Sequence, residues 1–317
     1  MEEGHLPVMV EEVMTALSPR PGSFQVDGTV GGGGHALRIL EATSPDGRLL
    51  GLDADPRAIA RVERRLAGFG DRVLLRNTNF EHLDSVAHDV GWDQVDGILL
   101  DLGLSSFQLA EGERGFSFRA EGPLDMRFDP TQGQPASELV NTLDEDALAR
   151  LFRAYGEEPD ARRIARAIVK ARAETPIETA AQLAAIVSGA VSRPRHTSRH
   201  SRIHPATRVF QALRIAVNAE LDVLARALGR AVDLLRPGGV LVVISYHSLE
   251  DRIVKRTFAA ERRGCICPPE APVCVCGRQP RLAAVGGTKP QLPSEAEVAA
   301  NPRARSARLR AAMRLAA

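Results

Sequence analysis

Apolar positions along the first hundred residues switch repeatedly between two spacings. Short apolar runs typical of strands occur at 24–27, 48–53, 73–75 and 97–101. Between them lie longer segments whose apolar residues recur every three to four positions, the period of a helix that buries one face. The clearest is 56–67, where Pro56 suits the first turn of a helix. Strands alternating with helices in this way predict an α/β fold with a parallel sheet covered on both faces.

The alternation stops near residue 110, where a segment rich in glycine, phenylalanine and charge begins. Three helices are expected after it, at 145–154, 158–173 and 179–191. Thr179 suits the N-cap of the third helix. The alternation then resumes with a helix at 208–235, which Pro237-Gly238-Gly239 should stop, and an apolar strand at 240–245.

This interruption divides the chain into two expected domains. Residues 1–110 and 211–317 are predicted to form the α/β domain, and residues 111–210 an all-helical domain inserted into it. At 317 residues the chain is long enough for both.

The composition is that of a globular protein. Apolar residues make up 44% of the chain and charged residues 26%, which allows a sizeable core under a charged surface. No stretch approaches the roughly 18 apolar residues of a membrane span, and the N-terminus lacks the regions of a signal peptide. A cytoplasmic location is therefore expected. With a net charge of +1, any affinity for nucleic acid must come from local basic clusters.

The first strand runs into a glycine-rich turn, Gly31-Gly32-Gly33-Gly34. A turn without Cβ atoms lets a ligand approach the backbone closely. Asp53, at the end of the second strand, stands where an acid can bind both ribose hydroxyls of an adenosine-type cofactor. The turn also fits a dinucleotide pattern, but Asp27 before it would repel a pyrophosphate and suits the ammonium of a methionine-type ligand. The residues favour a methyl donor over a nicotinamide cofactor and leave both open.

A third acid, Asp101, ends the fourth strand and opens the segment Asp101-Leu102-Gly103-Leu104-Ser105-Ser106. Ligands of an open parallel sheet bind beyond the carboxyl ends of its strands. Asp101 and the loop after it are therefore expected to lie between cofactor and substrate.

Segments along the whole chain resemble, in order, those of the MraW/RsmH family, bacterial methyltransferases that act on the N4 atom of a cytidine in small-subunit ribosomal RNA. These segments are 5–8, 31–35, 51–56, 79–80, 101–106, 114–118, 123–127, 155–158, 210–221, 247–252 and 301–306. One position departs from the family's pattern: Tyr246 stands where a phenylalanine is expected.

The resemblance implies a class I (Rossmann-like) methyltransferase domain with an inserted helical domain that helps to recognise substrate. It also implies S-adenosyl-L-methionine as the cofactor, and the exocyclic N4 amine of a cytidine in the 16S ribosomal RNA of the small subunit as the methyl acceptor. The family's cofactor contacts carry over to Gly33, Gly34, His35, Asp53, Phe80, Asp101 and Gln108.

The reaction implied by the resemblance needs a group that accepts a proton from the cytosine amine. The lone pair of this amine is delocalised into the ring, so an acceptor for one of its hydrogens makes it a better nucleophile. Asp101 is the first candidate, and Ser105 and Ser106 in the following loop are the next. Further polar candidates, which the sequence does not rank, are Asn218, Glu220, His247 and Ser248.

Two arginine-rich segments are candidates for contact with RNA phosphates. The segment 193–208 has five arginines, three histidines and no acid. The second is the C-terminal run of Arg303, Arg305, Arg308, Arg310 and Arg314. Neutralising several of these arginines is expected to weaken substrate binding and flatten its salt dependence.

All four cysteines lie close together, as Cys265-Ile266-Cys267 and Cys274-Val275-Cys276. Two such pairs could supply four thiolates to a zinc ion, although their spacing is tighter than that of the usual C-x-x-C knuckle. The sequence favours four reduced thiols and no metal.

Two other classes of protein stay open on the residues alone. One is a nicotinamide-dependent oxidoreductase, a function that does not explain the two arginine-rich segments. An RNA-binding assembly protein with a vestigial cofactor pocket would have no need of Asp27, Asp53 and Asp101. The oligomeric state is also open, with a homodimer as one option.

Overall fold

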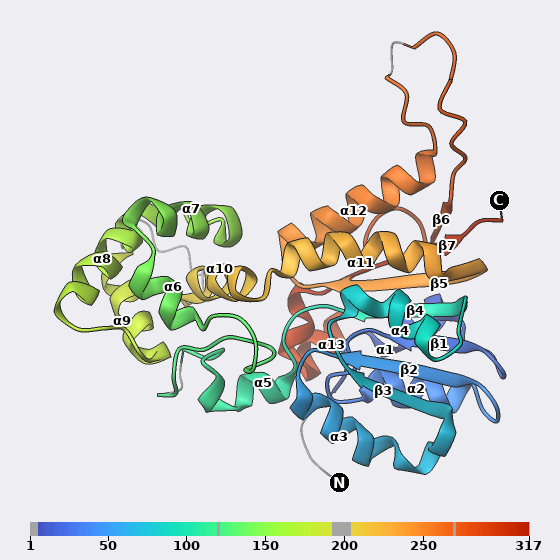
Figure 1. Ribbon diagram of the computed structural model, residues 1–317, viewed down its shortest axis with the longest axis horizontal. Coiled ribbons are helices and arrows are strands. Elements are labelled where there is room, and N and C mark those ends of the chain that lie inside the picture. The colour runs from blue at the N-terminus through green and yellow to red at the C-terminus, as the bar shows by residue number, and fades with distance from the viewer. Residues whose placement is uncertain (1–5, 119–120, 192–203, 269–270, 317) are drawn as a thin grey trace. The chain divides into compact units, whose positions relative to one another are not determined.

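The computed structural model describes residues 6–118, 121–191, 204–268 and 271–316 (Figure 1). The chain divides into two compact units, an α/β unit of Met1–Gly103 with Leu221–Ala317 and a helical unit of Leu104–Glu220. The helical unit extends beyond the expected insertion, 111–210, at both ends. No described helix combines the length and the apolar character that crossing a membrane requires.

One sheet forms the centre of the α/β unit, with seven strands among the described residues in the order β3-β2-β1-β4-β5-β7-β6. The strands are β1 (Phe24–Asp27), β2 (Arg48–Asp53), β3 (Val73–Asn77), β4 (Val95–Asp101), β5 (Leu235–Ser245), β6 (Leu282–Val285) and β7 (Arg308–Arg314). The pairs among β1 to β5 are all parallel, as predicted. The prediction of a wholly parallel sheet is wrong at one edge, because β7 runs antiparallel to both β5 and β6.

Helices cover both faces of this sheet. They are α1 (Val10–Leu17), α2 (Gly34–Ala42), α3 (Pro56–Leu66), α4 (Leu83–Asp89), α11 (Glu220–Leu234), α12 (Ser248–Arg263) and α13 (Glu295–Ala300), with 3₁₀ turns η1 (Ala67–Arg72), η2 (Phe80–His82) and η4 (Pro302–Ser306).

Side chains of the central strands alternate between two cores. On β4, Ile98 and Leu100 pack with residues of α4, α11 and α12, whereas Leu99 packs with residues of α1, α2 and α3. All three side chains are fully buried. A strand points successive side chains to opposite faces, so an unbroken apolar run is stable only where both faces are covered. This confirms the two-sided burial predicted from the apolar runs.

The helical unit has a core of its own. Its elements are α5 (Ser106–Ala110), η3 (Gly112–Arg114), α6 (Ala136–Thr142), α7 (Glu145–Gly156), α8 (Ala161–Glu174), α9 (Ala180–Ala190) and α10 (Thr207–Asn218). Phe152, Ile164 and Leu183 are fully buried in this core. Thr179 is the N-cap of α9 and exchanges hydrogen bonds with Gln182, which confirms the predicted cap.

The predicted helix at 208–235 is wrong in one respect, because it is two helices. The helix α10 ends at Asn218, its C-cap Ala219 has a left-handed φ of 48°, and α11 begins at Glu220. Neither glycine nor proline marks this break, so the apolar period alone predicted one continuous helix. The segment Pro237-Gly238-Gly239 follows the end of α11 and lies within β5, where the pairing with β4 is irregular.

Candidate active site

Three neighbouring strands of the α/β unit each end in an aspartate: Asp27 on β1, Asp53 on β2 and Asp101 on β4. Because these strands are parallel, their carboxyl ends meet at one edge of the sheet, the edge at which such sheets bind ligands. The sequence predicts all three acids at strand ends, and the structure brings these ends together.

Asp101 is held by contacts from three other segments. The hydroxyl of Tyr246 donates to its Oδ1 at 2.8 Å, and His35 Nδ1 lies 3.7 Å from its Oδ2. Its backbone N–H donates to Thr29 Oγ1 at 2.7 Å. Burial raises the pKa of Asp101 to about 7, against the opposing effect of the Tyr246 hydrogen bond. A carboxyl group with this pKa can exchange a proton near neutral pH.

Tyr246 is a permanent hydrogen-bond donor to Asp101. Burial raises the pKa of Tyr246 well above its ordinary value, and the negative charge of Asp101 is the second-largest cause of this rise. The phenol therefore keeps its proton over the whole physiological range. The sequence alone shows this residue only as a departure from the family pattern and gives no sign of its contact with the acid.

His35 is buried, and burial lowers its pKa, so that the ring is neutral near pH 7. Its Nε2 lies 2.9 Å from the carbonyl oxygen of Val8, which can only accept a hydrogen bond. Nε2 therefore carries the ring hydrogen, and the proton-free Nδ1 faces Asp101. His35 is thus hydrogen-bonded to the N-terminal segment through Val8 and lies beside Asp101 without a hydrogen bond to it.

Asp27 is the most deeply buried of the three acids, with 1% of its surface exposed. Burial raises its pKa to about 7, although His35 and the backbone N–H of Thr29 favour the ionised form. Asp101 and Asp53 raise the pKa of Asp27 further by repulsion. The edge of the sheet is therefore a place where negative charge is costly until a positive ligand compensates it.

Backbone groups on both sides orient the Asp53 carboxyl. Its Oδ2 accepts the N–H of Gly31, and its Oδ1 accepts the N–H of Asp55, each at 2.9 Å. Burial raises its pKa to about 6, and these two hydrogen bonds act in the opposite direction. A carboxylate offers about four acceptor positions, so this one retains capacity for the two hydroxyls of a ribose.

The glycine turn between β1 and α2 is shaped by close packing. Gly33 is the N-cap of α2 with a φ of 75°, a conformation that favours glycine. A Cβ on Gly34 would lie 2.8 Å from Pro7, and one on Gly28 would lie 3.0 Å from Phe80. Phe80 begins η2 and packs, partly buried, against the core on that face of the sheet. The turn can therefore hold only small residues.

The remaining predicted site residues belong to the helical unit. Ser105 Oγ accepts the N–H of Gln108, and Gln108 Oε1 accepts the N–H of Ser105 at 3.0 Å, so these two side chains together cap α5. The side chain of Ser106 lies outside the described residues. The cofactor contact of Gln108 and the catalytic roles of Ser105 and Ser106 stay predictions.

Two of the unranked polar candidates have clear structural partners in the helical unit. Asn218 accepts the N–H of Phe128 and donates to the carbonyl of Met126, which fastens that loop to α10. Glu220 accepts two hydrogen bonds from Arg214, at 2.7 and 2.8 Å. In the α/β unit, His247 is the N-cap of α12, and Ser248 is the first residue of that helix.

Of the two arginine-rich segments, the structure describes the C-terminal run but little of the segment 193–208. Residues 193–203 lie outside the described residues. In the C-terminal run, Arg303 and Arg305 are exposed on η4. Arg310 is buried and donates to both oxygens of Asp251 and to the carbonyl of Thr288. The prediction that Arg310 contacts RNA phosphates is therefore wrong. The arginines of β7 resemble a solvated basic run in the sequence, although the strand buries Arg310 together with Leu309, Ala311 and Ala312.

The cluster of acids, the small-residue turn and the oriented Asp53 fit a positively charged ligand with a ribose. Over residues 2–315 the sequence matches the MraW methylase family. The chain belongs to this family. It is 57% identical, over 98% of both chains, to ribosomal RNA small subunit methyltransferase H of Syntrophotalea carbinolica. The protein of that name from Thermomicrobium roseum is 55% identical, over 98% of this chain and 94% of its own.

As a MraW methylase, the protein is an S-adenosylmethionine-dependent methyltransferase. Its α/β unit has the class I fold, with five parallel strands and the antiparallel β7 inserted between β5 and β6. Among solved structures, an rRNA methylase from Streptococcus thermophilus aligns with a TM-score of 0.45 at 11% identity, covering 99% of this chain and 100% of its own.

Proposed function

We propose that this methylase transfers a methyl group to the exocyclic N4 amine of a cytidine in the 16S ribosomal RNA of the small subunit, in the cytoplasm. The observation that carries the proposal is the 57% identity, along essentially the whole chain, to a relative named ribosomal RNA small subunit methyltransferase H. The acid at the end of β4 supports it, because amine methylation requires a proton acceptor.

The edge of the sheet is the proposed cofactor site. S-adenosylmethionine supplies a methyl group activated by a sulfonium, and it carries a second positive charge on its ammonium. Asp53 binds the ribose hydroxyls with the acceptor capacity that its two backbone contacts leave. Asp27 and Asp101 compensate the positive charge, which also lowers the pKa of each acid. Gly33 and Gly34 let the ligand approach the backbone.

Asp101 is the proposed proton acceptor. Its carboxylate takes a hydrogen bond from the cytosine amine, which localises the nitrogen lone pair, and it receives the proton as the N–C bond forms. Tyr246 donates to Oδ1 and so fixes the orientation of the carboxylate. Most of the rate acceleration comes from alignment, which can supply on the order of 7–11 kcal/mol.

The helical unit is the proposed recognition domain for RNA. Its helix α8 exposes Arg162, Arg163 and Arg166, and positive charge of this kind binds phosphates without sequence preference. Arg303 and Arg305 add a second exposed basic site on η4 of the α/β unit. The target cytidine has to be unpaired or flipped out, because its amine is otherwise stacked or base-paired.

The proposal is tested by transfer of labelled methyl from S-adenosylmethionine to small ribosomal subunits that lack base methylation. Free 16S RNA and large subunits serve as parallel acceptors, and nucleosides from each are analysed by mass spectrometry. Label on the exocyclic nitrogen of cytidine, in small-subunit RNA alone, is the expected result. Absence of label in every acceptor, from protein that still binds the cofactor, would contradict the proposal, as would label on a ring carbon or ribose.

A further inference from the structure

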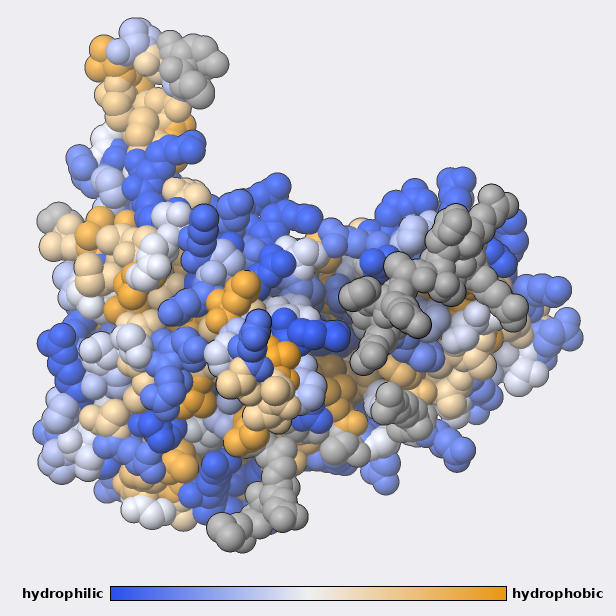
Figure 2. Space-filling model, turned by 180° about the vertical axis from the view of Figure 1, so that it is seen from behind, coloured by the Kyte–Doolittle hydropathy of each residue, from blue (hydrophilic) through white to orange (hydrophobic). Residues whose placement is uncertain are grey.

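Between α12 and β6, the described residues 264–268 and 271–281 extend away from the α/β unit as an arm (Figure 1). Its described residues form neither helix nor strand. Ile266, Val273 and Val275 on this cysteine arm are 67%, 69% and 87% exposed, and Figure 2 shows hydrophobic side chains on its surface. Because these three apolar side chains are exposed, the described residues of the arm do not form a hydrophobic core that could stabilise its conformation.

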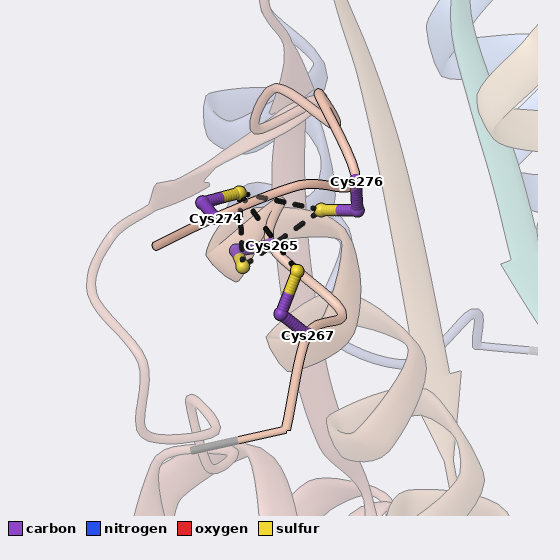
Figure 3. A group of neighbouring side chains, drawn as sticks. All are labelled: Cys265, Cys267, Cys274 and Cys276. Atoms are coloured by element: carbon purple, nitrogen blue, oxygen red, sulfur yellow. Dashed lines mark hydrogen bonds between the residues drawn. The ribbon is translucent and has the colours of Figure 1, made fainter. Parts of the chain in front are cut away.

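Four sulfur atoms converge inside the cysteine arm instead (Figure 3). Cys274 Sγ lies 3.5 Å from Cys265 Sγ, 3.5 Å from Cys276 Sγ and 4.0 Å from Cys267 Sγ. Cys265 Sγ and Cys276 Sγ are 3.8 Å apart. All four sulfurs lie within 4.8 Å of one another. The two C-x-C pairs thus form one compact group of sulfurs, although Cys267 and Cys274 are seven positions apart in the sequence.

These distances are those of a tetrahedral metal site. Zinc binds thiolates at 2.3 Å, so the sulfurs of a regular tetrahedron around it are about 3.8 Å apart. The four measured Sγ–Sγ distances, 3.5 to 4.0 Å, bracket that value. All four cysteines are free, and no described pair approaches the roughly 2.05 Å of a disulfide.

The backbone around the sulfurs is arranged as ligand loops require. Gly264 and Gly277, which flank the four cysteines, have φ of 71° and 62° and turn the chain at both ends of the group. A Cβ on Gly264 would lie 2.6 Å from the backbone nitrogen of Pro280, so only glycine lets the arm close at its base.

We propose that Cys265, Cys267, Cys274 and Cys276 bind one Zn²⁺ ion through four thiolates. The sequence alone favours free thiols, because C-x-C spacing is tighter than that of the usual zinc knuckle. The convergence of the sulfurs removes that objection. Four protein ligands leave no coordination position for water, so the ion is structural and folds the cysteine arm. It takes no part in methyl transfer.

The full chain, purified with a reducing agent and without chelator, tests this proposal by elemental analysis. About one zinc ion per chain is expected. The variant C265S/C267S/C274S/C276S should contain none and should still bind S-adenosylmethionine, since the cysteine arm carries none of the three site acids. The matched control is Val275→Ser, which changes the exposed residue between two ligands and should retain the zinc.

A second measurement does not depend on a variant that folds. Replacing the metal of the wild-type chain with Co²⁺ should give the visible bands of a tetrahedral tetrathiolate complex, and Zn²⁺ should abolish them. The proposal is overturned by a chain that is free of zinc and fails to bind Co²⁺. Stoichiometric iron in its place, two disulfides in the freshly purified chain, or zinc retained by the quadruple variant would also overturn it.

Discussion

The hydroxyl of Tyr246, the residue that follows β5, donates at 2.8 Å to Oδ1 of Asp101, the last residue of the neighbouring parallel strand β4. This hydrogen bond lowers the pKa of Asp101, which burial otherwise raises. Tyr246 therefore favours the ionised form of this mostly buried carboxyl, which is the form that can accept a proton. It acts through Asp101 and is a positioning residue.

Tyr246→Phe should move the pH profile of methyl transfer. Asp101 accepts a proton only when ionised, so the rate rises as pH increases through its pKa. Loss of the phenol removes an interaction that lowers this pKa, and the rising limb of kcat/KM should shift by about one unit to higher pH. Tyr155→Phe, which alters the other tyrosine of the chain, should leave the limb in place. An unshifted profile in Tyr246→Phe would exclude the positioning role.

Asp53→Asn should weaken cofactor binding and spare the chemical step. The amide offers one acceptor oxygen where the carboxylate offers two, and it removes the charge-assisted hydrogen bonds to the ribose. We expect the Kd for S-adenosylmethionine to rise about tenfold or more, with kcat at saturating cofactor nearly unchanged. Asp46→Asn, at an exposed acid, is the control for calorimetry. Equal Kd values for both variants would show that Asp53 does not contact the cofactor.

Cofactor affinity should fall as the solution becomes more acidic. The pKa values of Asp27 and Asp101 are about 7 and that of Asp53 is about 6, so the unliganded site holds protons near neutral pH. A cationic ligand binds the ionised form, so binding releases protons and strengthens from pH 5.5 to pH 8. Calorimetry in buffers of different ionisation enthalpy measures this release. The same Kd at both pH values, without proton release, would contradict it.

The stability of the unliganded protein should decrease as pH rises, whereas its affinity for the cofactor increases. The folded-state pKa values of these acids lie above their unfolded values, because burial disfavours the charge. Their contribution to stability is therefore lost as pH rises through about 7 and is regained towards pH 4. The increase in Tm that the cofactor produces should accordingly be largest at alkaline pH.

Neutralising Arg303 and Arg305 together should weaken RNA binding and flatten its salt dependence. Each phosphate contact that is lost reduces the slope of log K against log salt by roughly 0.7 to 0.9. The comparison variant is Arg310→Gln, which should cost about 3 kcal/mol of stability, because buried Asp251 loses its principal partner. That variant should keep the wild-type salt slope at a temperature where it is folded. If Arg303→Gln/Arg305→Gln keeps the wild-type slope of log K against log salt, η4 does not contact RNA phosphates.

The strands β1 to β5 could be predicted because each is an apolar run, and burial on both faces imposes that pattern directly on the sequence. The strand β7 could not, because arginines at positions 308, 310 and 314 resemble a solvated basic segment. Only the fold shows that Arg310 faces Asp251. The break at Ala219 was equally hidden, since alanine is a strong helix former and marks no boundary.

The acids of the site were predictable for a related reason. Asp27, Asp53 and Asp101 follow apolar strands directly, and parallel strands end at one edge. The contact of Tyr246 depends on the register of β5 against β4, in which Ile244 pairs with Asp101. That register places the tyrosine just beyond the acid, and no local pattern specifies it. The convergence of the four cysteines likewise depends on how the arm closes at Gly264 and Pro280.

The central claim is that Asp101 accepts the proton of the cytidine amine, and Asp101→Asn tests it most directly. The measurement is the single-turnover rate of labelled methyl transfer to small subunits, at saturating S-adenosylmethionine, with N4-methylated cytidine as the product counted. The rate should fall by about a hundredfold or more while saturation with the cofactor is still reached. A saturated Asp101→Asn enzyme that forms product at the wild-type rate would contradict it.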